Sequence, residues 1–438
     1  MKRLRITGAG LLASLILLAG CTEEVPTSPD PGLIPVEAET FEVLLPFETF
    51  ATAFRVDRGF GVAGDLATVF VASEWLEELT VRPLFRFLDF PASVGVIPPG
   101  ATVAEPDSSY VPVGGRLVLL FDTLRVDGSA PFDLQLSTVS ESWDPPTATW
   151  THAVDTLGDR RAWSTPGGGP LTPLASAPWT PSEGDSVILQ LDSLTLREWR
   201  DADGSGQGLV LSTATDGSRL RLRSLSLQMD VRSEVNPDTV IRVQPSSREF
   251  TTIYTPTPEF GEGVLPVGGA PSHRSSFRLE LPTTVEATGP ICRGAATCPV
   301  RLTADRVVFA ALQLTSIPTE PAALAPADTM TLDLRPVLAE DLLPRSPLGP
   351  PLRTQGVRVA PSWFAPGGSA SFEIAVTRYL RDVLRGEDSR GNPVSGVLSF
   401  LTLPEPAALG VATFAGPGVE GRPRLRIILT VSEGVSLP

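Results

Sequence analysis

Three tryptophans and two arginines lie within one segment rich in proline and glycine. Trp143, Trp150 and Trp163 fall within 21 residues, and Arg160 and Arg161 precede the last of them. An indole face can stack on a sugar ring, and a guanidinium beside it can bind a sugar carboxylate through two parallel hydrogen bonds. The pattern predicts a ligand surface made by Trp150, Trp163 and Arg161 with Trp143 beside them. The alternative is packing, which the large area that tryptophan buries favours.

A second segment has the spacing of a calcium-binding loop. Asp201, Asp203 and Ser205 supply oxygens at positions one, three and five, and Gly206 follows at position six. The twelfth position, where an EF-hand loop needs glutamate, is Ser212. Aspartate and glycine also form ordinary turns. We therefore expect no cofactor other than a structural calcium ion, for which this loop is the candidate site.

The first 21 residues predict export and lipidation. Lys2, Arg3 and Arg5 precede an apolar run from Ile6 to Ala19 that is too short to span a bilayer. The run ends in Leu-Ala-Gly-Cys21, which resembles the lipobox at which bacterial lipoproteins are cleaved and acylated. We expect cleavage after residue 20 and a lipid on Cys21. Because Thr22 follows rather than aspartate, we expect the outer membrane of the cell envelope as the location.

The two remaining cysteines are Cys292 and Cys298. Five residues separate them, and an exported protein enters an oxidising compartment, so we expect a disulfide between them. Two free thiols are the alternative.

Composition excludes several classes of function. The chain has 35 lysines and arginines against 50 aspartates and glutamates, a net charge of −15 that becomes −18 when Lys2, Arg3 and Arg5 are removed with the signal. Such a chain will not bind nucleic acid through its phosphates. Lys2 is its only lysine, and His152 and His273 are its only histidines. Schiff-base chemistry and histidine-dependent hydrolysis therefore have almost no residues to draw on, and we predict no catalytic residue.

Short alternating apolar segments between turn residues predict an all-β fold. The chain has 39 glycines and 44 prolines, and we expect its strands between them. These strands are expected within 116–121, 132–136, 187–191, 219–223, 372–376, 397–401 and 425–429. Residues 21–40 are acidic and rich in proline, which indicates a tether.

The two halves of the chain resemble each other. Phe85-Arg86-Phe87 corresponds to Phe277-Arg278-Leu279, and the segments 116–119 and 306–309 also correspond. In both halves a strand leads into a short helical turn, expected over Leu194–Trp199 and over Tyr379–Leu384, and a polar loop and another strand follow. This order predicts two tandem domains, 41–243 and 244–438.

These residues also suggest a family. They are Val71-Ala-Ser73, Arg82 to Arg86, Trp143, Thr149-Trp150, Trp163 and Trp199 in the first half, with Phe414 to Gly418 and Pro423 to Ile428 in the second. Together they resemble the DNRLRE domain, a jelly-roll module similar to a family of carbohydrate-binding modules. The resemblance implies a jelly-roll fold and a carbohydrate ligand. The second half departs from the pattern because it has Trp363 alone in place of the tryptophan loop.

We therefore predict two tandem β-sandwich (jelly-roll) domains on a lipid tether, each with a short helical turn. The predicted function is non-catalytic binding or adhesion at the cell envelope, with polysaccharide as the favoured ligand. A structural lipoprotein that binds other envelope proteins is the first alternative, and a polysaccharide-active enzyme is the second.

Overall fold

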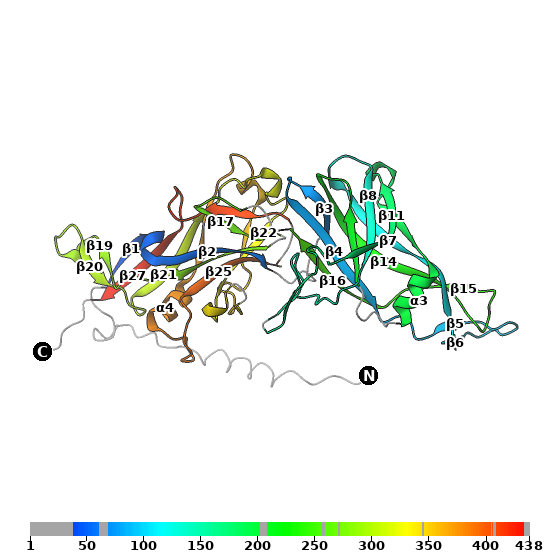
Figure 1. Cartoon of the computed structure of the whole chain (residues 1–438). Helices are drawn as coiled ribbons and strands as arrows, with labels where there is room; N and C mark the ends of the chain where they lie inside the picture. Colours follow the sequence, from blue (N-terminus) through cyan, green and yellow to red (C-terminus); the bar gives the residue numbers. More distant parts are fainter. Residues whose placement is uncertain are drawn as a thin grey trace, which may run out of the picture.

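The computed structural model describes residues 38–60, 69–156, 158–201, 208–255, 259–269, 272–343, 346–403, 405 and 409–432. Every pair of strands between these residues is antiparallel, and helices are few and short, as the alternating segments predict. The strands form two groups that share no sheet, and Figure 1 shows the two groups side by side. We call residues 69–255 the first lobe, and residues 38–60 with 259–432 the second lobe.

The first lobe is built on one large sheet that curls until its ends approach each other. Among the described residues ten strands belong to it, in the order β11-β8-β13-β4-β3-β14-β7-β12, with β15 beside β14 and β16 beside β4. Their bounds are β3 Val69–Trp75, β4 Leu79–Leu88, β7 Val111–Asp127, β8 Phe132–Val139, β11 Leu171–Trp179, β12 Ser186–Leu191, β13 Gly208–Thr213, β14 Ser218–Arg232, β15 Val240–Val243 and β16 Ser247–Tyr254. Two hairpins extend it, β5 Val94–Val96 with β6 Glu105–Asp107, and β9 His152–Asp155 with β10 Arg160–Ala162. The inward side chains, such as Phe85, Leu119 and Leu227, fill its core.

The second lobe is a sandwich of two sheets. One, the β1–β24 sheet, has the order β1-β27-β21-β24, and the other, the β2–β23 sheet, has the order β2-β18-β25-β22-β23. Their bounds are β1 Ala38–Pro46, β2 Ala51–Phe60, β18 Ser272–Leu279, β21 Val307–Thr315, β22 Met330–Pro336, β23 Val357–Val359, β24 Ser371–Ala375, β25 Val397–Leu403 and β27 Arg424–Ser432. Two short pairs accompany them, β17 Val264–Val267 with β26 Ala412–Ala415, and β19 Thr284–Ala287 with β20 Cys298–Arg301.

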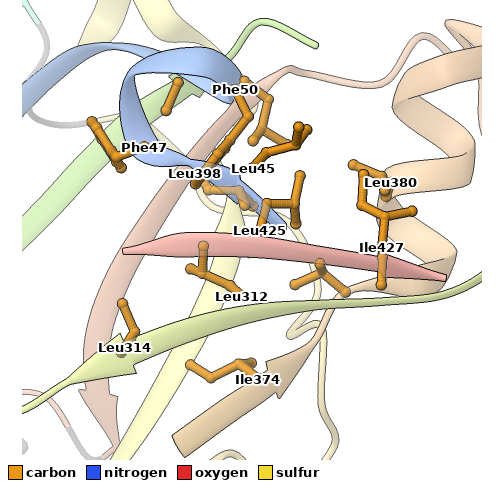
Figure 2. Packing of buried hydrophobic residues seen from close by; sticks show 14 of the residues in the cluster. Leu45, Phe47, Phe50, Leu312, Leu314, Ile374, Leu380, Leu398, Leu425 and Ile427 are labelled. Carbon is orange, nitrogen blue, oxygen red and sulfur yellow. The ribbon is translucent and has the colours of Figure 1, made fainter. Parts of the chain in front are cut away.

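The second-lobe core lies between these sheets. Figure 2 shows side chains of β1, β21, β24 and β27 packed with Leu398 of β25. Helix α2 (Phe47–Phe50) contributes Phe47 and Phe50, and helix α4 (Thr377–Arg385) contributes Leu380. Along β27 the buried residues Leu425, Ile427 and Leu429 alternate with Arg424, Arg426 and Ile428, so both arginines lie on the outer face.

The strand pairing divides the chain differently from the expected domains 41–243 and 244–438. Strands β1 and β2 pair with β27 and β18, so residues 38–60 belong to the second lobe. Strand β16 lies beyond residue 243 and yet pairs with β4 over eight residues. Phe60 pairs with Ser272, so the first lobe is inserted between two neighbouring strands of the second. The two lobes are therefore not consecutive halves of the chain. Strands that are distant in sequence pair with each other in the second lobe.

The resemblance between the halves is present in the strand order. Strands β12-β7-β14-β3 of the first lobe match β24-β21-β27-β1 of the second, and β11-β8-β13-β4-β16 match β23-β22-β25-β18-β2. Helix α3 (Ser193–Asp201) follows β12 as α4 follows β24, close to the two helical turns that the sequence predicts. The lobes differ in that β3 pairs with β4, which joins the two layers of the first lobe into one sheet.

An apolar cluster joins the lobes. Phe70, Trp75 and Leu79 of the first lobe pack with Leu324 and Leu409 of the second. Arg125 of the first lobe also forms an ion pair with Asp328 of the second lobe, at 2.8 Å. Within the described residues we find no helix with the length and apolar character that a membrane span requires.

Candidate binding surfaces

The tryptophan loop, residues 141–170, covers the outer face of the first-lobe sheet. Trp143 and Trp163 have only 3% and 4% of their surface exposed, and they pack with Leu84, Val210 and Ile253. The indole N–H of Trp163 donates to the carbonyl of Thr149 at 2.8 Å. These two tryptophans therefore pack between the loop and the outer face of the sheet, which is the packing alternative. A direct ligand contact by either is not supported, because a sugar ring cannot reach a buried indole face.

Alternate residues of β4 position the loop. Arg82 and Arg86 point to the outer face of the sheet, and their guanidiniums lie over Trp150 at 4.9 Å and over Trp143 at 5.0 Å. Arg82 also donates to the carbonyl of Gly167 at 2.9 Å, and burial lowers the pKa of its guanidinium. A side chain at Gly167 would collide with both Arg82 and Trp150. The sequence Arg82-Pro-Leu-Phe-Arg86 thus holds the loop in place through cation–π contacts.

The remaining predicted ligand residues, Trp150 and Arg161, are more exposed than the two buried tryptophans. Trp150 is half-buried and packs against the same apolar cluster as Trp143 and Trp163. Arg161 lies on the exposed strand β10, and its Nε is 3.4 Å from a carboxylate oxygen of Asp159. Arg160 pairs with the buried Asp155 at 3.1 Å. Trp150 and Arg161 therefore remain the only members of the predicted set with surface available to a ligand.

A groove that the sequence does not predict lies on the outer face of the β1–β24 sheet. Its volume is about 710 Å³, and side chains of β21, β24 and β27 form its base. The residues that line it are Gln313, Thr315, Ile317, Ser369, Ser371, Phe372, Glu373, Glu420, Gly421, Arg422 and Arg424. The alternation of apolar and polar residues in each strand was visible in the sequence. Nothing in the sequence showed that the polar faces of these three strands form one surface.

The groove is electrostatically balanced and ordered by hydrogen bonds. The amide of Gln313 donates to Glu373 at 2.8 Å, and the hydroxyls of Thr315 and Ser371 are 3.0 Å apart. Beside the groove, Arg426 lies between Glu373 at 3.3 Å and Glu42 at 2.9 Å. The hydrogen bond from Arg426 lowers the pKa of Glu42, and the same bond raises the pKa of Arg426. These contacts fix planar amide, carboxylate and guanidinium groups on one exposed surface.

The other predicted sites have different outcomes. Cys292 and Cys298 are joined in a disulfide that links the ends of a loop between β19 and β20, in agreement with the expected pairing. Cys21 lies outside the described residues, as do Asp203 and Ser205 of the predicted calcium loop. Asp201 lies at the end of α3 and pairs with Arg200 at 2.7 Å. In the described ranges no group of three or more histidine, cysteine, aspartate or glutamate side chains could hold a metal ion.

No protein-family model matches the chain, and no curated protein sequence matches it. Two solved structures that resemble it are described as those of infectious bursal disease virus, Gx strain and Gt strain. Each is 11% identical to this chain with a TM-score of 0.13. The matches cover 90% and 92% of this chain, and 76% and 75% of the viral chains. A likeness this distant carries no argument about fold or function.

Proposed function

We propose that this protein is an exported lipoprotein of the cell envelope that binds carbohydrate without transforming it. The lipobox-like sequence that ends at Cys21 supports the anchor. The groove on the β1–β24 sheet is the observation from which we infer the binding function, and Trp150 and Arg161 in the first lobe are further candidate contacts.

The chemistry of the groove suits sugar hydroxyls. Each hydroxyl both donates and accepts, and neighbouring hydroxyls on a ring match planar side chains that offer two polar atoms. Gln313, Glu373 and Arg424 are such side chains, and all three line the groove. The lining contains two arginines and two glutamates, so it favours a neutral or sparsely charged glycan over a polyanion.

Two variants of the full mature chain test the groove. Gln313 and Arg424 are cross-strand partners on the outer face, and changing both to alanine removes polar contacts without opening the core. Arg116 and Gln228 are cross-strand partners on the matching strands of the first lobe, with a hydrogen bond of 2.9 Å, so their double alanine variant is a matched control. On a glycan array and by calorimetry, the groove variant should bind at least about tenfold more weakly, because each lost hydrogen bond contributes about 1 kcal/mol.

The other outcomes separate the alternatives. Equal binding by both double variants, with loss on Trp150→Ala, would move the site to the first lobe. Absence of glycan binding, together with capture of a defined envelope protein, would favour the scaffolding function. Release of reducing ends from a polysaccharide would indicate an enzyme, with Glu373 and Glu420 as the first carboxylates to test.

The anchor has its own test. Cys21→Ala removes the thiol that would carry the lipid, so the variant should move from the membrane fraction to the soluble fraction of the envelope. If the variant still partitions into detergent as the unchanged protein does, the proposed lipid on Cys21 is wrong.

A further inference from the structure

The chain enters the second lobe beside a group of arginines. Strand β1 begins at Ala38, which pairs with Ser432. Two residues further along the pair, the backbone N–H of Thr430 donates to the carbonyl of Arg306 at 2.8 Å. Strand β1 also lies against the β19–β20 hairpin, as Figure 1 shows, and β20 ends at Arg301. The segment 301–306 is therefore next to the point from which the N-terminal segment leaves the lobe.

A pocket of about 470 Å³ opens at this segment, and we call it the arginine pocket. Its apolar lining is Leu281, Pro282, Leu302, Ala304 and Leu384. Its polar lining is Thr283, Arg301, Thr303, Asp305 and Arg385. Both arginines are exposed, and Arg385 ends helix α4, where a cation also complements the helix dipole. The pocket thus combines an apolar floor with guanidiniums and hydroxyls at its rim.

The local charge opposes the charge of the whole chain. Arg306 donates to the carbonyl of Arg301 at 3.0 Å, which places a third guanidinium beside the pocket. Asp305 is the one carboxylate in the described lining, and a hydrogen bond from Thr303, with help from Arg306 and Arg385, lowers its pKa. The carboxylate of Asp382, which is outside the lining, is 3.6 Å from the guanidinium of Arg385. Three arginines against Asp305 and Asp382 leave one net positive charge at this site, on a protein of net charge −15.

We propose that the arginine pocket binds the phosphate headgroup of an anionic phospholipid. Arg301 and Arg385 would hold the phosphate oxygens, Thr283 and Thr303 would donate hydrogen bonds, and the apolar floor would contact the glycerol and the first methylenes. The inference rests on the proposed lipid anchor, which brings this end of the molecule to a membrane. Residues 22–37 span at most about 55 Å, so an anchor alone leaves the orientation open. The pocket orients the lobe with the β1 end towards the bilayer and the first lobe away from it.

The test uses the mature chain with Cys21→Ala, so that any membrane binding comes from the protein surface. Its probes are vesicles of phosphatidylcholine alone and vesicles that also contain phosphatidylglycerol, in flotation at about 0.05 M and 0.5 M salt. We expect binding only to the anionic vesicles, and its loss at high salt. Arg301→Gln with Arg385→Gln should weaken binding by roughly 30-fold, since each arginine near an anionic surface contributes about fivefold.

A matched control removes the same charge elsewhere. Arg223 and Arg232 are exposed arginines of the first lobe, so Arg223→Gln with Arg232→Gln should bind as the parent does. Arg301→Lys with Arg385→Lys should keep most of the binding, because it keeps the charge. Equal loss in the pocket variant and the control would overturn the proposal, as would equal binding to both kinds of vesicle. Binding of inorganic phosphate without binding to vesicles would also overturn the assignment to lipid. None of these outcomes depends on Cys21, whose lipidation the fractionation assay tests separately.

Discussion

At the scale of single residues, the burial of a side chain decides its role. Trp163 and Trp150 occur in the same loop, and the sequence predicts the same contact for both. Trp163 has 4% of its surface exposed, whereas Trp150 is half-buried under Arg82. The sequence could show that tryptophans gather in the loop. It could not show which indole faces the sheet, because that depends on how the loop folds over β4 and β16.

The burial of Trp163 predicts a large effect on stability. Trp163→Ala should lower the free energy of unfolding by about 3–5 kcal/mol, since it removes a buried aromatic side chain and leaves a cavity. Trp150→Ala should cost less, because part of that indole is already in water. Urea unfolding of the two variants against the parent measures both values. A stable Trp163→Ala variant that has lost glycan retention would instead place Trp163 in a binding site.

Asp107 gives the chain a pH-dependent contribution. It is 3% exposed and accepts hydrogen bonds from Ser233 at 2.5 Å, Ser109 at 2.8 Å and Glu234 at 3.0 Å. The bond from Ser233, with those backbone bonds, lowers its pKa below that of the unfolded chain. Its stabilisation is therefore complete above about pH 4, the unfolded value, and is lost as pH falls through the lower folded value. Asp107→Asn should lower the melting temperature at neutral pH, and the difference from the parent should shrink below pH 4. A constant difference down to the lowest pH would show that charge on Asp107 contributes nothing.

At the scale of elements, the periodicity of the sequence predicts best the strands and helices that local interactions determine. Strands and the two short helices follow from alternation and from helical spacing, so both α3 and α4 were expected within a few residues. Strand partners were not predicted, because pairing depends on segments far apart in the chain. The match between 116–119 and 306–309 illustrates this. In the sheets Gly115 pairs with Leu191 just before α3, and Ala311 pairs with Ala375 just before α4, so Gly115 and Ala311 are structurally equivalent. The sequence match, which aligns residue 116 with residue 306, is therefore offset from the structural equivalence by about six residues.

The β19–β20 hairpin is the element that the disulfide constrains. Its loop is short, so the chain-entropy account gives a stabilisation of only about 2 kcal/mol. Cys292→Ser with Cys298→Ser should therefore lower the unfolding midpoint of the second lobe modestly and leave the first lobe unchanged. Residues 69–255 contain none of the three cysteines, so the unfolding midpoint of a fragment with these residues, with and without reductant, is the control. A loss shared equally by both lobes would mean that they unfold as one unit.

At the scale of the whole molecule, insertion relates the two lobes. The chain leaves β2, forms the complete first lobe, and returns to β18 beside the strand that it left. Their contact buries Trp75, Leu79 and Leu324 almost completely, so neither lobe is independent of the other at that surface. Two similar halves in a sequence predict tandem domains. The insertion of one lobe into the other leaves no local signal in the sequence, so the sequence could not correct this prediction. The groove escaped prediction for the same reason, since its polar residues come from three strands that only the fold brings together.

Insertion makes a specific prediction about fragments. Residues 69–255 contain all the strands of the first-lobe sheet, including β16, which buries Thr251 and Ile253 against β4 and the tryptophan loop. Residues 41–243 lack β16 and carry most of β1 together with β2, whose partners β27 and β18 are absent. We therefore expect 69–255 to unfold cooperatively in urea and 41–243 to aggregate, because unpaired strands and an uncovered apolar face promote association. Residues 38–60 joined by a glycine–serine linker to 259–432 should form the second lobe. Because each isolated lobe exposes half of the cluster around Trp75 and Leu324, the two should associate when mixed, and Leu324→Arg should prevent it by placing a charge in that cluster. Cooperative unfolding of 41–243 with the same midpoint as 69–255 would show that β16 is dispensable, and the insertion would then have no energetic consequence for the first lobe.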